Sequence, residues 1–496
     1  MSLRSSGRLA IAGVVIAGLA LGGVAPGASA SSLPGWLHTA GAEIKTASNA
    51  TFVIKAVTWS GMERATCTPN GLTKVSLDAA LANIAGLGFN TVRLSYSNEC
   101  LASTLVANVD PLKNPSMYGK TALKVMDAII ARAALYDLNV VLVRDRVSAT
   151  SEARLWYTTR YSQARWIADW KMLASRYAQV LNVIGFDLAS NPGTSSCWGC
   201  DSKARDWQAA ATKAGNAIHK VNSRLLIIVG GVGSTTKGYR SSDGGGLEGV
   251  AKHPVKLTVK HRVVYSAHEY SPTINPQKYY KYGKWSSTVT KAWNAHWGYL
   301  ATKKIAPVML GEFGAGITNA KDKKWLKTIV AYATKKKIGF AYFSFIPTGS
   351  KSGGVTDADG TTRNVRSLYL EPLLGLAKVV PEVVDEPTPT ASPVPEEPDG
   401  NSATMHVTST WNEGWVGEIL VSSEKGVSNW TLRFPEPNAT AITSQYGMTC
   451  SIAASFITCV SDGYFAKIPA GESRTVGLQV ASVKPLLDSV GIVVTH

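Results

Sequence analysis

The stretch IAPVMLGEFG, residues 305–314, shows the pattern that decides the fold. Its short apolar run, Pro307 to Leu310, is followed almost at once by a carboxylate, Glu312. Such runs are typical of strands buried in a parallel sheet. Seven more runs have the same character: Phe52 to Val57, Thr91 to Leu94, Val140 to Val143, Val183 to Leu188, Leu225 to Val229, Val263 to Ala267 and Gly339 to Phe343.

Amphipathic helical patterns lie between these runs. Eight alternating strand and helix units predict an α/β fold, a (β/α)₈ TIM barrel, with its site at the C-terminal ends of the strands. The helical patterns are Leu77 to Ile84, Ala122 to Leu135, Ala164 to Val180, Trp207 to Val221 and Trp325 to Ala333.

The composition changes abruptly after the last of these units. Residues 381–400 read PEVVDEPTPTASPVPEEPDG, a Pro/Thr/acidic segment that cannot bury a core and is expected to be a linker. We therefore expect a barrel over residues 31–380 and a second domain over residues 401–496. The second domain alternates apolar and polar residues in short runs, which predicts a small all-β sandwich; the runs are Gly417 to Val421, Trp430 to Phe434 and Val476 to Val480.

The N-terminal residues predict export. Arg4 and Arg8 precede an apolar stretch from Leu9 to Val24, which is followed by the small residues ASA at 28–30. This order is typical of a cleaved signal peptide, here residues 1–30, and the stretch is too short and Gly-rich to favour a membrane span. We expect a secreted, extracellular protein with no membrane span.

The six cysteines fit an oxidising compartment. Their spacing suggests local disulfides, although sequence alone cannot fix the pairing. A zinc site at Cys197 and Cys200 would need a second Cys or His pair at ligand spacing, which the chain lacks, so no metal and no cofactor is expected. The favoured pairs are Cys67 with Cys100, Cys197 with Cys200, and Cys450 with Cys459.

The charge is strongly positive, with 51 Lys and Arg against 34 Asp and Glu, or +17. Such a charge attracts acidic polymers non-specifically, whether pectin, wall teichoic acid or nucleic acid. The lysines are scattered over predicted helix surfaces, as at Lys323-Lys324 and at Lys335-Lys336-Lys337, where solvated helix faces are the ordinary explanation. No nucleic-acid-binding motif is present, so acidic wall polymers are possible partners and a specific nucleic acid is not expected.

Polar side chains near the strand ends are the candidates for chemistry. They include Arg93, Asp145, His268 and Glu312. This distribution resembles the family 5 glycoside hydrolases, specifically bacterial endoglucanases of the cellulase type. The resemblance covers nearly the whole barrel through NTVRLSYS, LWYTT, VIGFDL, CWGC, AGNAI, VYSAHEYSP, WGYL, IAPVMLGEFG and WLKTIV.

The resemblance implies a retaining hydrolase, which needs two carboxyl groups about 5 Å apart, one as nucleophile and one as acid/base. Glu312 matches the family's nucleophile. Arg93 matches the arginine that keeps the nucleophile ionised, while His268 and Tyr270 match residues that hold it and contact the substrate.

The acid/base position departs from the family. Where the family has His-Asn-Glu-Pro, this chain has Ala-Ser-Asn-Pro, so Asn191 replaces the acid/base glutamate and Ser190 replaces a substrate-binding asparagine. An amide has no titratable group near neutral pH, so it cannot protonate a leaving oxygen and recover the proton. Other departures lie on the same face: Asp145 for a histidine, Gly230 for a glutamate after the fifth strand, and FSFI at 343–346 for Trp-Ser-Trp-Asn.

The second domain resembles a family 2 carbohydrate-binding module through STWNEGWVGEILV, NWTLRF and YFAKIPAGES. Such modules stack a strip of aromatic rings on the glucose rings of an insoluble chain. Trp411, Tyr446 and Tyr464 fall at the three strip positions, and Trp430 matches a buried core indole. The resemblance therefore implies binding to cellulose or a related β-glucan.

Three functions remain open. The first and favoured one is a catalytically impaired pseudo-hydrolase that binds polysaccharide as a monomer, because several substrate contacts are missing together. The second is an active endo-β-glucanase with Glu312 as nucleophile and a substitute acid such as Asp145 or Glu269. The third is a decoy or interaction protein at the cell wall.

Overall fold

The computed structural model describes residues 33–233, 244–281, 285–375, 401–411, 413–436, 439–453, 456–482 and 493–495. The predicted signal peptide, residues 1–30, and the predicted linker, residues 381–400, lie outside the described residues. Within the described part, no helix is both long enough and apolar enough to cross a membrane.

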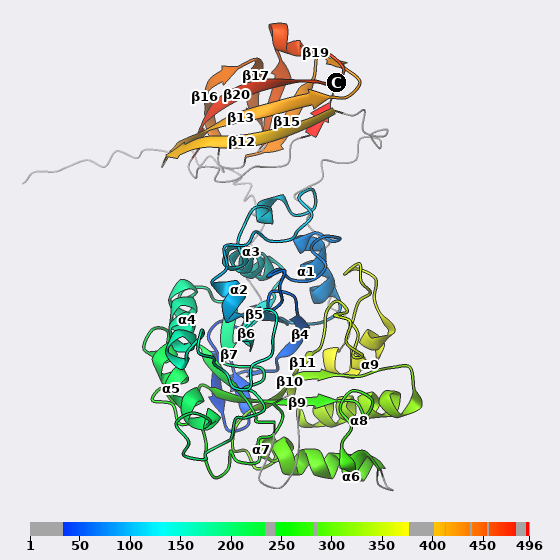
Figure 1. Ribbon diagram of the computed structural model, residues 1–496. Helices are drawn as coiled ribbons and strands as arrows, with labels where there is room; N and C mark the ends of the chain where they lie inside the picture. Colours follow the sequence, from blue (N-terminus) through cyan, green and yellow to red (C-terminus); the bar gives the residue numbers. More distant parts are fainter. Residues whose placement is uncertain are drawn as a thin grey trace, which may run out of the picture. The chain divides into compact units, whose positions relative to one another are not determined.

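The predicted barrel is confirmed: eight parallel strands close on themselves (Figure 1). The first barrel strand begins later than predicted, because Thr51–Phe52 (β3) belongs to a small antiparallel sheet with β1 (His38–Ala40) and β2 (Glu43–Lys45). The barrel strands are β4 (Lys55–Trp59), β5 (Thr91–Ser97), β6 (Asn139–Arg146), β7 (Val183–Asp187), β8 (Leu226–Gly230), β9 (Val263–Tyr270), β10 (Val308–Gly314) and β11 (Gly339–Tyr342).

Helices surround the barrel (Figure 1), and several begin at a capping side chain. Ser76, Ser162, Asp206 and Asn319 each accept a hydrogen bond from a backbone N–H in the first turn, which satisfies a donor that the helix leaves unpaired. The helices are α1 (Leu77–Gly86), α2 (Asn98–Leu101), α3 (Ala122–Leu135), α4 (Gln163–Arg176), α5 (Trp207–His219), α6 (Trp285–Trp293), α7 (Tyr299–Thr302), α8 (Ala320–Lys336) and α9 (Val365–Leu374).

Buried indoles join α4 and α5 to the C-terminal ends of two strands. Trp166 and Trp170 of α4 donate through Nε1 to the carbonyl of Leu188, at 3.1 and 3.3 Å. Trp207 of α5 donates to the carbonyl of Gly230 at 2.8 Å. Because indoles this large rarely shift in a packed core, they fix the backbone that follows β7 and β8, where the site lies.

The predicted sandwich is also confirmed, as two antiparallel four-stranded sheets with the orders β12-β13-β20-β16 and β17-β18-β15-β21. Trp430 is fully buried, as predicted, and donates through Nε1 to the carbonyl of Phe465. The strands are β12 (Asn401–Trp411), β13 (Gly414–Ser423), β15 (Thr431–Pro435), β16 (Ala439–Tyr446), β17 (Met448–Ala453), β18 (Phe456–Ser461), β20 (Glu472–Ser482) and β21 (Val493–Thr495), with a short pair β14 (Val427–Ser428) and β19 (Lys467–Ile468) beside them.

All three predicted disulfides are present, Cys67–Cys100, Cys197–Cys200 and Cys450–Cys459. The last joins directly opposed residues of β17 and β18, so it closes a hairpin as expected.

Candidate active site

Glu312 lies at the C-terminal end of β10, and three side chains hold its carboxylate. The Tyr270 hydroxyl donates to Oε1 at 2.5 Å. The Ser190 hydroxyl donates to Oε2 at 3.0 Å, and Arg93 Nη1 lies 3.4 Å from the same oxygen. The Glu312 side chain keeps 13% of its surface exposed, so the carboxylate is fixed yet still reachable from outside.

A glycine beside Glu312 allows this placement. The pairing of β10 with β9 shifts register between Leu310 and Glu312. A Cβ on the intervening Gly311 would lie 1.7 Å from Ser266 Oγ on β9, so a larger residue would force Ser266 to move. Glycine suits this close approach of the two strands, and the register shift brings Glu312 opposite His268.

Arg93 contacts the polar residues around Glu312 and holds them in place. It is fully buried on β5, and its Nη2 donates to Asp187 Oδ2 at 3.0 Å and to Ser190 Oγ at 2.8 Å. Burial acts to lower the pKa of Arg93, but the negative charges of Asp187, Glu312 and Asp145 outweigh it and raise the pKa. Arg93 therefore stays charged and positions Glu312, with no surface of its own for a sugar.

His268 and Glu269 follow each other on β9 and face opposite ways, as successive strand residues must. His268 is buried opposite Glu312, and its charge also acts on Asp187. Glu269 is buried on the helix side, where it accepts hydrogen bonds from Trp297 Nε1 at 2.9 Å and from Tyr279 at 3.5 Å. The structure thus gives Glu269 a place behind the barrel wall, which does not suit a substitute acid.

Asn191 stands in a tight turn after β7. Its Oδ1 accepts a hydrogen bond from the backbone N–H of Gly193 at 2.9 Å, the geometry of an Asx turn. Gly193 has φ +97°, and a Cβ there would lie 2.4 Å from the carbonyl of Arg154. The turn is therefore closely packed around an amide that stabilises its own loop.

Two further departures from the family pattern, at Gly230 and after β11, lie in closely packed surroundings. A Cβ on Gly230 would lie 3.1 Å from the carbonyl oxygen of Ala189, so the end of β8 is close to the backbone beside Ser190. After β11, Phe345 and Ile346 are buried, and Phe345 packs edge-on against Trp59. These residues fill the core and offer no indole face to a sugar.

Asp145 and Glu63 add two carboxyl groups near the cluster. Asp145, near the end of β6, has its pKa raised by burial and then by the negative charge of Glu312. Glu63 lies in the loop after β4 and is 2% exposed; burial, and then the charge of Asp145, raise its pKa to about 7. Burial and repulsion from a neighbouring negative charge thus raise the pKa of both carboxyl groups.

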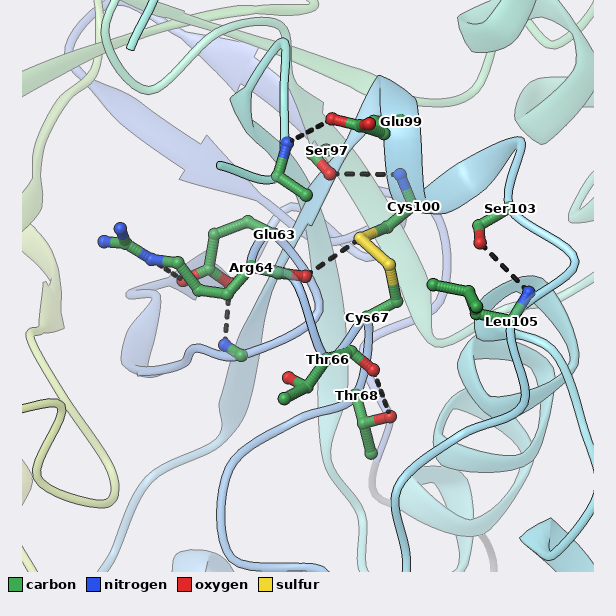
Figure 2. Close-up of a disulfide and its surroundings, with 12 residues drawn as sticks. Glu63, Arg64, Thr66, Cys67, Thr68, Ser97, Glu99, Cys100, Ser103 and Leu105 are labelled. Atoms are coloured by element: carbon green, nitrogen blue, oxygen red, sulfur yellow. Dashed lines mark hydrogen bonds and ion pairs between the residues drawn. A yellow bond between two sulfur atoms is a disulfide. The ribbon is translucent and has the colours of Figure 1, made fainter. Parts of the chain in front are cut away.

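The loop that carries Glu63 is tied down by a disulfide (Figure 2). Cys67 is joined to Cys100 of α2, just beyond β5, and its backbone N–H donates to the carbonyl of Arg64 at 2.8 Å. The Glu63 carboxylate accepts from the N–H of Gly61 at 2.7 Å and lies 3.3 Å from Arg64 Nε. The disulfide and these hydrogen bonds hold a buried carboxyl group at the mouth of the barrel.

Asp187 and Glu63 were missed in the sequence. Asp187 ends the run VIGFD, so strand periodicity assigns it to the strand, and the charge at the end of an apolar run is the signal of its different role. Glu63 lies four residues beyond β4, so it does not directly follow a strand end and its position gives no signal in the sequence. Among the described residues, no group of three or more His, Cys, Asp or Glu side chains is arranged to hold a metal ion.

In the sandwich, two of the three predicted strip residues can be located. Tyr446 is 62% exposed and Tyr464 is 74% exposed, and both rings pack edge-on against Phe465, with centroids 4.9 and 5.5 Å away. Trp411 ends β12, but its side chain is not among the described parts. The structure thus places two exposed tyrosine rings in contact with one phenylalanine.

The raised pKa of Glu63 predicts a pH-dependent stability. A carboxyl group whose pKa rises on folding stabilises the protein below its unfolded pKa of 4.5, and this stabilisation is lost as the pH rises towards 7. The loss amounts to about 3 kcal/mol for this one group. We expect the free energy of unfolding of the wild type, measured by denaturant titration, to fall as the pH rises from 4.5 to 7. In Glu63→Gln this fall should be smaller by about 3 kcal/mol.

Glu99, on the other side of the same disulfide, supplies the control. Its pKa is lowered by hydrogen bonds from Ser148 and Ala149, so Glu99→Gln should leave the slope between pH 4.5 and 7 unchanged. Parallel wild-type and Glu63→Gln profiles would contradict the assignment of a protonated, buried Glu63.

Comparison with known proteins identifies both folded parts. Residues 48–349 match the family model "Cellulase (glycosyl hydrolase family 5)", and residues 401–490 match the model "Cellulose binding domain". An endoglucanase of Paenibacillus polymyxa is 37% identical over 342 residues, which cover 68% of this chain and 86% of the relative. The major extracellular endoglucanase of Xanthomonas campestris is 31% identical over 335 residues, covering 65% of this chain and 68% of the relative.

Solved structures agree with these matches. An endocellulase from the archaeon Pyrococcus horikoshii has a TM-score of 0.64 and 29% identity, and the match covers 69% of this chain and 100% of that one. The catalytic domain of the Xanthomonas enzyme also gives a TM-score of 0.64 and 29% identity, over 68% and 100% of the two chains. The chain therefore belongs to the family 5 glycosyl hydrolases of the cellulase type and carries a cellulose-binding domain after its barrel.

Proposed function

We propose that this chain is a secreted, cellulose-binding member of the family whose barrel is catalytically impaired. The observation that carries the proposal is Asn191 at the acid/base position, with its Oδ1 bonded to the backbone of Gly193. Without a titratable group there, the leaving oxygen receives no proton from this position. The chain therefore loses general acid assistance, which typically contributes a factor of about 10² to 10⁴ to the rate.

The surroundings of Asn191 support the same proposal. Ser190, in place of a substrate-binding amide, donates its hydroxyl to Glu312 and accepts from Arg93, so its polar atom serves the protein. Gly230 and the buried Phe345 and Ile346 supply neither a carboxylate nor an indole to a glucose ring. Several lost contacts weaken the positioning of a substrate, on which much of the rate depends.

A second candidate is an active endo-β-glucanase in which Asp145 is the acid. It is favoured by the place of Asp145 near the end of β6, where burial and the charge of Glu312 raise its pKa, because the first step requires an acid with a raised pKa. In this case Glu312 attacks the anomeric carbon while Asp145 protonates the leaving oxygen.

The remaining parts of the proposal concern the whole chain. We propose a signal peptide at residues 1–30, a barrel at 31–380, a linker at 381–400 and a cellulose-binding sandwich at 401–496. The partner would be cellulose or a related β-glucan, bound through Trp411, Tyr446 and Tyr464, with the protein acting as a monomer outside the cell. Acidic wall polymers are further proposed partners, attracted by the net charge of +17.

The first prediction separates the two candidates. The rate of carboxymethylcellulose hydrolysis by the wild type should lie near the uncatalysed background. The Glu312→Gln variant should have the same rate. Asn191→Glu should restore little, because Ser190 and the residues after β11 would still hold the sugar poorly. The measurement is release of reducing ends over a pH range of 4 to 8.

Substantial wild-type turnover would overturn the impaired barrel. If that turnover falls with rising pH and disappears in Asp145→Asn, the second candidate is correct. Strong activity from Asn191→Glu alone would show that the sugar subsite is still intact.

The second prediction uses the retained nucleophile. A 2-fluoro-cellobiosyl donor with a dinitrophenyl leaving group needs no proton for its departure, so loss of the acid should matter far less in the first step. Because Tyr270 and Arg93 hold the Glu312 carboxylate, we expect a sugar adduct on the Glu312 peptide by mass spectrometry. Glu312→Gln should give no adduct; absence of the adduct in folded wild type would mean that the cleft no longer admits β-glucan.

The third prediction concerns the sandwich. The full chain should sediment with microcrystalline cellulose, and Tyr446→Ala/Tyr464→Ala should weaken retention several-fold, because two stacking faces are lost. Leu420→Ala removes a side chain that is 47% exposed on β13 and should have no effect. Retention should persist at about 1 M salt, where the Debye length is near 3 Å. If retention on cellulose is lost at high salt and the tyrosine variant is retained as well as the wild type, adsorption is electrostatic.

A further inference from the structure

A large groove lies on the outside of the barrel, and Glu312 is not part of its lining. It runs between α6 and α8, which lie side by side (Figure 1), and has a volume of about 1080 Å³. We call it the lysine groove. Its lining includes Ser286, Thr290 and Asn294 from the α6 side and Lys323, Lys324, Lys327, Lys335 and Lys336 from α8.

One wall of the lysine groove is a row of positive charges. Lys323, Lys327 and Lys335 follow one another at multiples of four residues along α8, so they share a face of the helix. From Lys323 to Lys335 the row extends about 18 Å. All three are exposed, and no salt bridge is found for any lysine of this wall in the described part of the chain.

The opposite wall is polar and uncharged. Ser286, Thr290 and Asn294 also recur every four residues, which places two hydroxyls and one amide along a single face. The Tyr332 hydroxyl donates to Asn294 Oδ1 at 2.7 Å and fixes that side chain. The groove therefore presents hydrogen-bonding groups on one side and cations on the other.

The lining contains no carboxylate, and α8 lacks exposed acids to balance its lysines. The one acid of α8, Asp322, is fully buried and bonded to Thr273. Like charges three or four residues apart destabilise a helix by a few tenths of a kcal/mol per pair. A bound polyanion would remove this repulsion, which is a physical reason for a charged ligand at this place.

We propose that the lysine groove binds an acidic polysaccharide, a polyuronate that carries one carboxylate on each sugar. Its carboxylates would face the lysines of α8, and its hydroxyls would face Ser286, Thr290 and Asn294. The proposal rests on the proposed attraction of acidic wall polymers and gives it a specific site, which is separate from the barrel cleft and the sandwich because none of the residues named for those sites lines this groove.

The chemistry of the walls favours a polyuronate over a nucleic acid. Single-stranded nucleic acids are held by exposed aromatic faces on which bases stack. Tyr332, the aromatic residue of the lining, is only 7% exposed and has Lys336 over its ring. The cations are all lysines, which act as point charges, whereas arginine supplies the fork that grips a phosphate with two hydrogen bonds.

The test measures binding of a fluorescent oligogalacturonide to the full-length protein by anisotropy at low salt. Lys327→Glu/Lys335→Glu should weaken binding about 10-fold or more, because two attractions become repulsions. Lys171→Glu/Lys213→Glu changes the net charge equally through exposed lysines of α4 and α5, and should change binding less than about 2-fold. The methyl-esterified oligosaccharide, which lacks the charge, should bind far more weakly.

A second variant distinguishes a polyuronate from any other polyanion. Ser286→Ala/Thr290→Ala should weaken the oligogalacturonide about 3- to 10-fold, the usual effect of losing hydrogen bonds to sugar hydroxyls, and should leave inorganic polyphosphate binding unchanged. Circular dichroism confirms that each variant is folded. The proposal is overturned if both lysine pairs have equal effects, or if polyphosphate binds more tightly and the hydroxyl variant changes neither ligand.

Discussion

One buried cation holds the barrel site together. Arg93 is fully buried, and its guanidinium contacts Asp187 at the end of β7, Ser190 just beyond it, and Glu312 on β10. A charge in such a place costs several kcal/mol unless opposite charges and hydrogen bonds surround it. The ends of three strands, β5, β7 and β10, are thus joined through one side chain, and the positions of Ser190 and Glu312 depend on it.

The same buried cation affects what a substitution at Glu312 or at Asn191 would cost in stability. Glu312 is one of the two carboxylates bonded to Arg93, so its loss would leave part of a buried positive charge uncompensated. The Asn191 side chain accepts a hydrogen bond from the Gly193 N–H in the turn that contains it. A change at position 312 is therefore expected to lower stability, because it leaves part of the buried Arg93 charge without a counter-ion.

The sequence could predict the barrel and most of the cluster because strand periodicity and strand-end polarity are local signals. Arg93, His268, Tyr270 and Glu312 all follow from them. The first strand was placed three residues early, because Thr51–Phe52 continues the apolar run but pairs with β2. Glu63 could not be predicted, since its burial depends on a loop that the Cys67–Cys100 disulfide fixes against α2. Contacts between distant segments, such as Arg93 with Asp187, leave no periodic trace in a sequence.

The two proposed glycan-binding surfaces use different interactions, apolar stacking in the sandwich and charge attraction in the lysine groove, so they would respond differently to salt. Tyr446 and Tyr464 present apolar faces, whose attraction for sugar rings changes little with salt. The lysine groove presents exposed charges, which salt screens strongly: their reach falls from about 10 Å at 0.1 M salt to about 3 Å at 1 M. A cell-wall surface contains neutral and acidic polymers together. Contact with the neutral polymer would persist as ionic strength rises, while contact through α8 would be released, so the same molecule could remain attached and change its neighbours.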